Sequence, residues 1–424
     1  MILRVDALWT GDRFTGPTLI ALDGERLVVT SGEDAASAAH AASTAHAAST
    51  AHAASTAHVA STAHAASADP GASAPPVADI LSLGGTLFPS LTDHHTHLSL
   101  SDPTALFRGG ITDAVDLGWV PSVAATWLVD VRDRPAIAIA GALLTAPGGY
   151  PVSAGWAPPG AAREIGGPRE AGEAVRQQVM MGASRIKVAL NSDAGETVDN
   201  ATLSAIVEES HAVGLPVVAH VQGAGQTARA VHAGVDQLAH APFTERLDDA
   251  LVAEAAGAGM TWISTLDIHG WGAPTAGFRI AIDNLRRFAE HGGRVLYGTD
   301  LGNGDLTVGV NARELTAIRQ AGLDGPDLVR TIAGASTPAH IGPRVAWIPS
   351  PPPADSAHLP AWLATARGLH AADLATIDSA TIALAAEATT AAAAATAAAA
   401  AAKTDLATPA PTPIASAPVR QEHP

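Results

Sequence analysis

The chain has 424 residues, a formal net charge of −17 and no cysteine. An acidic chain repels a phosphate backbone, which argues against nucleic-acid binding. The absence of cysteine excludes disulfides and thiolate metal sites, so any metal ion must be held by His, carboxylate or modified Lys side chains.

Residues 1–33 predict the N-terminal part of a small β domain. Short apolar runs alternate there with turns at Thr10–Asp12 and Asp23–Gly24, a pattern typical of antiparallel strands. Met1–Thr15 has no long apolar segment of the signal-peptide kind, and the Ala run near 384–402 is weakly apolar and interrupted by Glu387 and several Thr. We therefore expect no secretory signal, no membrane helix and a cytoplasmic location.

Residues 34–77 contain a low-complexity insertion in which AHAAST recurs every six residues. Ala and small polar side chains bury too little area to offset the entropy of ordering the chain, so we expect a disordered surface segment. The alternative is a His-rich metal tether. A spacing of six is not a helix-face repeat, which argues against it.

Residues 78–345 alternate short apolar runs with helical segments, which predicts βα units and a parallel sheet. There are eight apolar runs, the number of strands in a closed (β/α)8 TIM-type barrel with its active site at the C-terminal strand ends. The runs are Thr86–Leu91, Ile111–Leu117, Ala136–Leu144, Arg185–Leu190, Pro216–Val221, Gln237–Ala241, Met260–Leu266 and Arg294–Thr299.

The C-terminal part predicts little independent structure. Residues 346–380 begin as a Pro-rich linker, and a weak strand signal at Asp373–Ile377 indicates a degenerate return to the small β domain. Residues 381–424 are rich in Ala and Pro without an apolar face, so we expect a disordered tail. The predicted fold is therefore α/β, a barrel joined to a small β-sandwich domain formed from the chain ends.

The sequence Asp93-His94-His95-Thr96-His97 follows directly after the first apolar run. Residues two apart on an extended strand point to the same side, so His95 and His97 can bind one ion while His94 faces away. Polar residues in a strand-end loop are the alternative reading of this motif alone.

Four more chemically distinctive residues fall in or at the ends of later apolar runs. Lys187 lies inside the fourth run, where an unpaired charge would be costly. His220, His240 and Asp300 end the fifth run, the sixth run and the eighth. A barrel brings these strand ends into one ring, so we expect a shared metal site.

These segments resemble the amidohydrolase superfamily, particularly its imidazolonepropionase-like and Xaa-dipeptidase-like metal-dependent hydrolases. The resemblance covers roughly residues 78–345. The AHAAST insertion, the weakly preserved closing signature at Gly368–Leu374 and the Ala-rich tail depart from the family. The resembling segments are Gly84–His97, Gly110–Ala114, Leu144–Gly149, Gly182–Val188, Gly214–His220, Ala233–His240 and Gly298–Asp300.

The resemblance implies a binuclear site and a mechanism. His95 and His97 would bind the more buried metal with Asp300; His220 and His240 would bind the second. Lys187, carbamylated, would bridge two divalent ions, for which zinc suits a His-rich, oxygen-bridged site. A metal-bridging hydroxide would attack the carbonyl carbon of a small-molecule amide, linear and peptide-like or cyclic. Asp300 would be the catalytic proton shuttle to the leaving amine.

Three further residues are candidates for substrate binding. Tyr150 and Trp156 belong, with Trp119 and Trp271, to a group of aromatic residues beyond strands 2, 3 and 7, and His269 follows strand 7. Aromatic packing over the barrel rim explains the aromatic residues equally well, and a solvated loop His is the more common case for His269.

Other functions share this residue set. A deaminase usually has a mononuclear site and a Glu shortly after the fifth-strand His, whereas Val221-Gln222-Gly223 follows His220 here. A lactonase or phosphotriesterase uses the same ring of residues, and a metal-binding pseudoenzyme is the non-enzymatic alternative. The sequence leaves open the substrate, the native metal and whether the chain forms a homo-oligomer.

Overall fold

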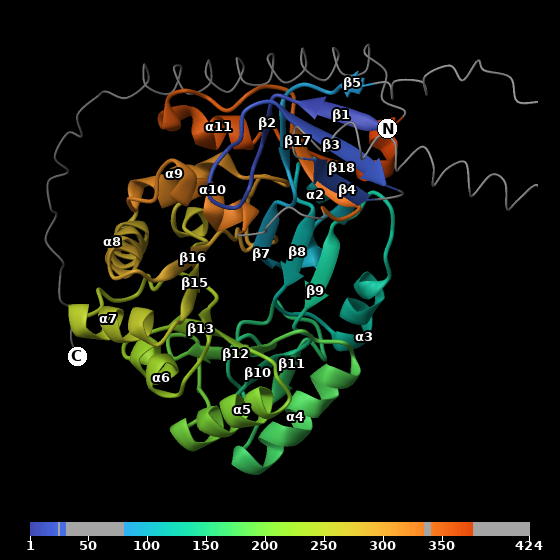
Figure 1. Cartoon of the computed structure of the whole chain (residues 1–424). Helices are drawn as coiled ribbons and strands as arrows, with labels where there is room; N and C mark the ends of the chain where they lie inside the picture. The colour runs from blue at the N-terminus through green and yellow to red at the C-terminus, as the bar shows by residue number, and fades with distance from the viewer. Residues whose placement is uncertain (24–25, 31–79, 335–340, 376–424) are drawn as a thin grey trace, which may run out of the picture.

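The computed structural model describes residues 1–23, 26–30, 80–334 and 341–375 (Figure 1). The AHAAST insertion and the Ala-rich and Pro-rich tail expected from the sequence lie outside the described residues. Within these ranges, every helix is too short or too polar to span a lipid bilayer.

Ten parallel strands form the centre of the molecule and are assigned to two sheets. The three-stranded sheet has the order β7 (Thr92–Thr96), β8 (Asp113–Asp116), β9 (Ala136–Ile139). The seven-stranded sheet has the order β11 (Ala162–Glu164), β10 (Leu143–Thr145), β12 (Ile186–Asn191), β13 (Val217–Gln222), β14 (Gln237–Leu238), β15 (Thr261–Ile263), β16 (Arg294–Leu296). The chain is thus an α/β protein with a predominantly parallel sheet, as predicted.

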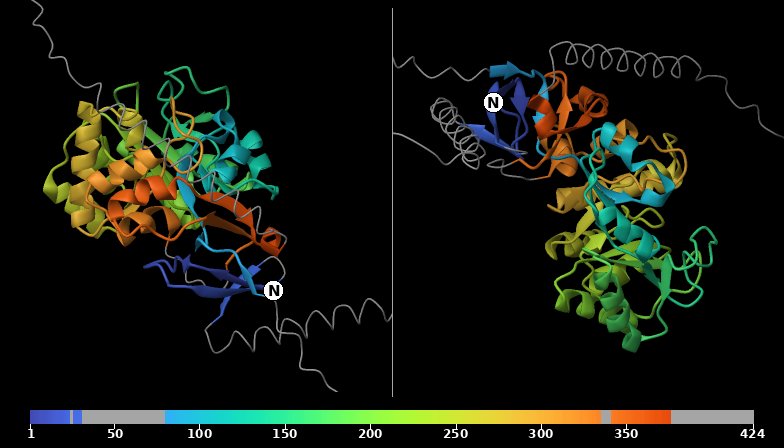
Figure 2. Two further views of the ribbon diagram at one scale, coloured as in Figure 1. Left: turned by 90° about the horizontal axis from the view of Figure 1, so that it is seen from above. Right: turned by 90° about the vertical axis from the view of Figure 1, so that its right-hand side faces the viewer.

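Helices cover the outside of these strands and mostly alternate with them along the chain (Figures 1 and 2). Their N-termini carry the expected signals: Asp199 caps one helix through Thr202 N (2.8 Å), and Pro168 occupies the first turn of another. The helices are α2 (Pro103–Arg108), α3 (Pro121–Ala124), α4 (Pro168–Met180), α5 (Asn200–Ala212), α6 (Gln226–His232), α7 (Asp249–Gly257), α8 (Ala276–Glu290), α9 (Ala312–Gln320), α10 (Pro326–Ala333) and α11 (Leu359–Leu363). Short 3-10 turns are η1 (Leu98–Leu100), η2 (Ala125–Leu128), η3 (Asp267–His269), η4 (Ser356–His358) and η5 (Ala371–Ala375).

The main hydrophobic core lies between the parallel strands and the helices. Strands β12 and β13 are almost entirely buried, which explains their continuous apolar sequence. Trp262 of β15 stacks on Phe288 of α8 with ring centroids 4.0 Å apart, so one aromatic pair joins strand to helix.

Two four-stranded sheets built from both ends of the described chain lie at the end of the molecule away from α4 and α5 (Figure 1). Their side chains share a second core that includes Leu3, Leu87 and Trp347. One sheet has the order β4 (Arg26–Thr30), β3 (Thr18–Asp23), β1 (Ile2–Val5), β5 (Ile80–Ser82). The other has the order β18 (Arg367–His370), β17 (Arg344–Ile348), β6 (Thr86–Phe88), β2 (Ala7–Leu8).

Two strand predictions are wrong in detail. The run Thr86–Leu91 is not the first parallel strand: its β6 pairs antiparallel with β17, and the first parallel strand is the polar β7. The strand expected at Asp373–Ile377 is also misplaced, because Ala371–Ala375 forms a 3-10 turn and the strand is β18. In both cases a long-range pairing partner, rather than the local apolar pattern, determines where the strand lies.

Candidate metal centre

His95 and His97 come from β7 and the residue that follows it, and both are buried. Each ring is fixed through Nδ1: His95 donates to the Ala239 carbonyl (2.8 Å), and His97 donates to the Gly118 carbonyl (3.0 Å). A carbonyl can only accept, so Nδ1 keeps its proton, and whenever a ring is uncharged its Nε2 is free to bind an ion.

Asp300 follows β16 with a left-handed backbone (φ 57°), which turns its carboxylate toward these rings. Its Oδ1 lies 3.0 Å from His95 Nε2 and 3.2 Å from His97 Nε2, and Asn303 Nδ2 donates to Oδ2 (2.8 Å). Burial opposes ionisation, yet the neighbouring imidazoles, His95 first, hold the pKa of Asp300 well below its usual value. Asp300 is therefore an anion at neutral pH.

The contact between His95 and Asp300 places two electron-rich atoms face to face. Burial and the positive charge of Lys187 lower the pKa of His95 to about 4, so the ring is uncharged at neutral pH. Because Nδ1 carries the ring proton, lone pairs on Nε2 and Oδ1 meet across 3.0 Å. Two ligands about 2.0–2.1 Å from one tetrahedral ion lie about 3.3 Å apart, so a metal cation fits between them.

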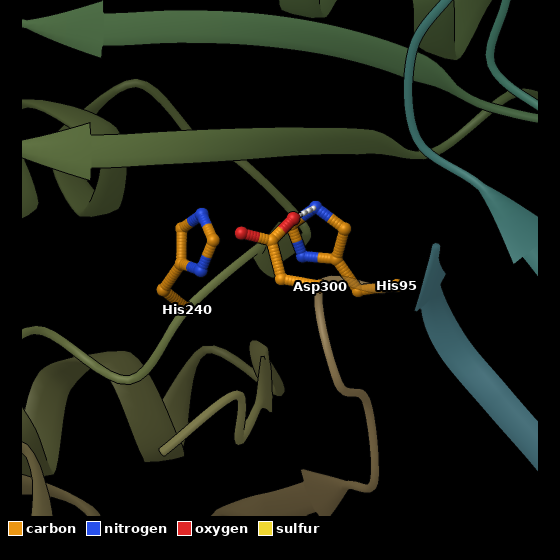
Figure 3. A group of neighbouring side chains, drawn as sticks. All are labelled: His95, His240 and Asp300. Atoms are coloured by element: carbon orange, nitrogen blue, oxygen red, sulfur yellow. Dashed lines mark ion pairs between the residues drawn. The ribbon is translucent and has the colours of Figure 1, made fainter. Parts of the chain in front are cut away.

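His240 completes the tightest group, in which one ligand atom from each of His95, His240 and Asp300 lies within 4.8 Å of the others. Figure 3 shows the Asp300 carboxylate between the two rings. His240 Nδ1 lies 2.8 Å from Thr265 Oγ1, which fixes the ring. Burial lowers the pKa of His240 well below its usual value, so this ring too is uncharged.

His220 of β13 and Lys187 of β12 line the same cavity. Asn191 Nδ2 donates to His220 Nε2 (3.3 Å), and the Tyr150 ring stacks on His220 with centroids 5.0 Å apart. Burial lowers the pKa of His220 to about 3. All six residues predicted as metal ligands are thus gathered around one cavity.

Lys187 is almost completely buried, and within the described part of the chain no acidic group forms an ion pair with its amine. Burial lowers its pKa to about 7, although Asp300 and Asp116 act in the opposite direction. A buried amine without a partner that titrates near neutrality is suited to reaction as a free base or to modification.

The cavity has a volume of about 520 Å³, the size of a small-molecule site. The three residues predicted to bind substrate all line it: Tyr150, Trp156 and His269. His269 stacks on Phe243 at 4.0 Å, and its buried Nε2 has no hydrogen-bond partner among the described residues. Of the aromatic group, Trp271 also lines the cavity, and Trp119 packs behind Trp156.

Several supporting residues were not singled out from the sequence. Asp93 accepts hydrogen bonds from His95 N (3.0 Å), Thr299 N (3.1 Å) and Thr299 Oγ1 (2.6 Å), and so ties β7 to the segment that carries Asp300. Asn191 and Asn303 orient His220 and Asp300. Of these residues, only Asp93 could have been found from the sequence, because it lies in the His motif. Asn191 at the end of β12 and Asn303 in a loop have no such sequence pattern around them.

A second polar network holds the loop that carries His269. Glu314 of α9 accepts from Asp267 N through Oε2 (2.7 Å), while its buried Oε1 has no partner among the described residues. Asp267 in turn accepts from Arg313 Nε (2.9 and 3.0 Å) and Asn311 Nδ2 (2.8 Å). Helix α9 thereby fixes η3 at the cavity wall.

The sequence matches no protein-family model and no curated protein. Solved structures do resemble the fold. A. niger ochratoxinase has a TM-score of 0.61 at 17% identity over 82% of this chain and 89% of that chain. A Xaa-Pro dipeptidase with bound methionine has a TM-score of 0.57 at 18% identity, covering 78% and 86%.

A third similar structure is AH, bottromycin amidohydrolase, with a TM-score of 0.57 at 18% identity over 91% of this chain and 90% of that chain. All three identities are low, so the likeness concerns architecture rather than substrate. The chain therefore shares the fold of these three structures, as expected from its strand-end motifs.

Proposed function

We propose that this protein is a metal-dependent hydrolase that cleaves an amide-type C–N bond, linear or cyclic. The observation that carries the proposal is the lone-pair contact of His95 Nε2 with Asp300 Oδ1 at 3.0 Å, beside a cavity of about 520 Å³. Such a contact is unfavourable without a cation between the atoms, and the cavity leaves room for a substrate next to it.

The finer architecture that we propose is one closed eight-stranded barrel, in which β9 and β10 together form one barrel strand and β11 is an added edge strand. Its support is a set of bonds that join β7 to the segment after β16: His94 N to Tyr297 O (3.0 Å), Asp300 N to His95 O (2.8 Å) and His97 N to Leu301 O (2.8 Å). A small inner core with members from both parallel sheets, among them Val115, Val218 and Ile263, fits the same arrangement. The two flanking sheets would form the β-sandwich.

The donor set suits two divalent ions, and zinc is the metal we expect. His95, His97 and Asp300 would hold one ion, His220 and His240 the second, and Lys187 in carbamylated form would bridge them. The unpaired buried amine of Lys187 supports this assignment, because carbamylation would replace a buried ammonium, which repels metal ions, with an anion that binds them. When bound, such ions polarise a carbonyl oxygen and lower the pKa of a water molecule.

The residues of the chain would then position the substrate and transfer a proton to its leaving amine. Asp300 presents Oδ2, oriented by Asn303, and would take a proton from the attacking water and return it to the leaving amine. His269 offers its unpartnered Nε2 to a polar group of the substrate. Tyr150 and Trp156 would bound the substrate on one wall, which limits its orientation at the reacting carbonyl.

The test is a substrate screen of the purified protein loaded with zinc. We expect amine release from at least one member of a library of N-acyl amino acids, dipeptides, amide derivatives and cyclic amides, and release that is about 10²–10⁴-fold slower from Asp300→Asn at equal metal content. A matched panel of lactones, phosphotriesters and aminopurines covers the other chemistries of the fold. Turnover confined to that panel, or metal binding without any turnover, would contradict the proposal.

A further inference from the structure

The substrate cavity carries almost no charge of its own. Among the described residues that line it, only Lys187 and Asp300 are formally charged, and both belong to the proposed metal centre. The remaining polar side chains outside that centre are Tyr150, Gln222, His269 and Asn303, all neutral groups. A ligand in this cavity therefore meets neutral hydrogen-bonding groups and apolar surface.

No arginine is among the described residues that line the cavity. Arg313 lies behind the wall, where the Asp267 carboxylate and the Asp305 carbonyl hold its guanidinium. Arg163 in β11 and Arg169 in α4 do not line the cavity. A carboxylate moved out of water needs such a cation, for which Arg is the usual partner. Outside the proposed metal centre, the described residues of the cavity walls provide no such cation.

Aromatic side chains instead form two walls. Tyr150 and Trp156 follow β10, whereas Phe243 and Trp271 follow β14 and β15, which β12 and β13 separate from β10 in the sheet. Trp156 and Trp271 remain 37% and 49% exposed. Large exposed indoles at a cavity mouth are typical of sites that bind aromatic or bulky apolar groups.

We propose that the substrate is an amide that carries no carboxylate and presents an aromatic or bulky apolar group to Trp156 and Trp271. This inference rests on the proposed hydrolase function and narrows it. Free dipeptides and N-acyl amino acids are therefore disfavoured as substrates, because either would place a carboxylate without a cationic partner against the cavity walls. The His269 Nε2 and the Gln222 amide would bind neutral polar atoms of the ligand.

Two compounds of the same shape test the charge preference: N-benzoyl-phenylalaninamide and N-benzoyl-phenylalanine. We expect the carboxamide to be preferred about tenfold or more, the equivalent of one strong interaction. The preference should appear both in kcat/KM of the zinc-loaded protein and in equilibrium binding to chelator-treated protein, measured by calorimetry. Because chelator-treated protein binds without hydrolysing, the binding experiment measures the preference of the cavity independently of catalysis.

Two variants sharpen the test. Leu100→Arg adds a cation at an exposed lining position (49% exposed) and should shift the binding preference toward the carboxylate by about tenfold. Val129→Arg adds the same cation at a position that is 63% exposed and outside the cavity, and should leave the preference unchanged. Trp271→Ala should weaken carboxamide binding, and Trp271→Phe should restore most of it.

The outcomes are distinguishable. Tighter binding of the carboxylate by the parent protein, or failure of both compounds to bind chelator-treated protein at millimolar concentration, would overturn the inference and leave the hydrolase proposal standing. The expected binding preference without hydrolysis of any amide would overturn the hydrolase proposal and leave the inference on the cavity intact.

Discussion

Replacing Glu314 by Gln should stabilise the protein above neutral pH. Burial raises the pKa of this carboxyl to about 7 from an ordinary value of 4.5. Between these values the unfolded chain releases the proton and the folded chain keeps it, so stability falls as pH rises and then levels off. With about 1.4 kcal/mol for each pKa unit, the folded protein loses roughly 3 kcal/mol that an uncharged side chain would keep.

Gln is a close match in shape, and its amide oxygen can still accept from Asp267 N, as Glu314 Oε2 does at 2.7 Å. The measurement is urea unfolding of Glu314→Gln and the parent at pH 5 to 8.5, after chelator treatment so that metal binding does not vary with pH. We expect the stability of the variant relative to the parent to increase by about 2–3 kcal/mol over this range.

The matched control is Glu208→Gln on the exposed surface of α5, which should show a difference that does not vary with pH. If Glu314→Gln gives an equally flat difference, Glu314 titrates at an ordinary pKa despite its burial. The reasoning from burial and the missing partner of Oε1 would then be refuted.

Other changes address the metal centre and the core. Dialysed protein should retain about two divalent ions per chain by elemental analysis, and a stoichiometry near zero in active protein would disprove the metal-site proposal. Lys187→Ala should lose most activity and regain part of it with short carboxylic acids that can bridge two ions; full activity would show that Lys187 is only structural. Asp300→Asn should lower turnover per bound metal about 10²–10⁴-fold, whereas equal turnover per metal would require another proton carrier. Phe288→Ala removes the ring stacked on Trp262 at 4.0 Å and should cost about 3–5 kcal/mol in urea unfolding, with a loss below 1 kcal/mol meaning that the stack contributes little.

The sequence was sufficient to predict the parallel α/β fold and the six residues around the cavity, since His and Asp at the ends of apolar runs are conspicuous. It misplaced the first strand because β7 reads Thr-Asp-His-His-Thr. Asp93, His95 and Thr96 are buried there as polar side chains that form hydrogen bonds or belong to the proposed metal site, so the strand has no apolar pattern. The run Thr86–Phe88 has such a pattern, but its partner β17 lies far along the chain.

The supporting polar residues could not be predicted for a different reason. Asn191, Asn303 and Glu314 have ordinary neighbours in sequence, and their roles arise only when distant segments meet. Glu314 lies on a helix whose sequence gives no reason to bury a carboxylate. Its burial follows from the contact of α9 with the η3 loop.

The two flanking sheets have a consequence for the order in which the protein can assemble during synthesis. Strand β6 is made before all ten parallel strands, yet its antiparallel partner β17 is made after them. At translation rates of about 5–20 residues per second, β6 leaves the ribosome roughly 10–50 s before β17 exists. The parallel-strand region must therefore fold, or wait, while Leu87 and its neighbours in the second core are still uncovered. A nascent chain of this protein would present that apolar surface to chaperones for most of its synthesis.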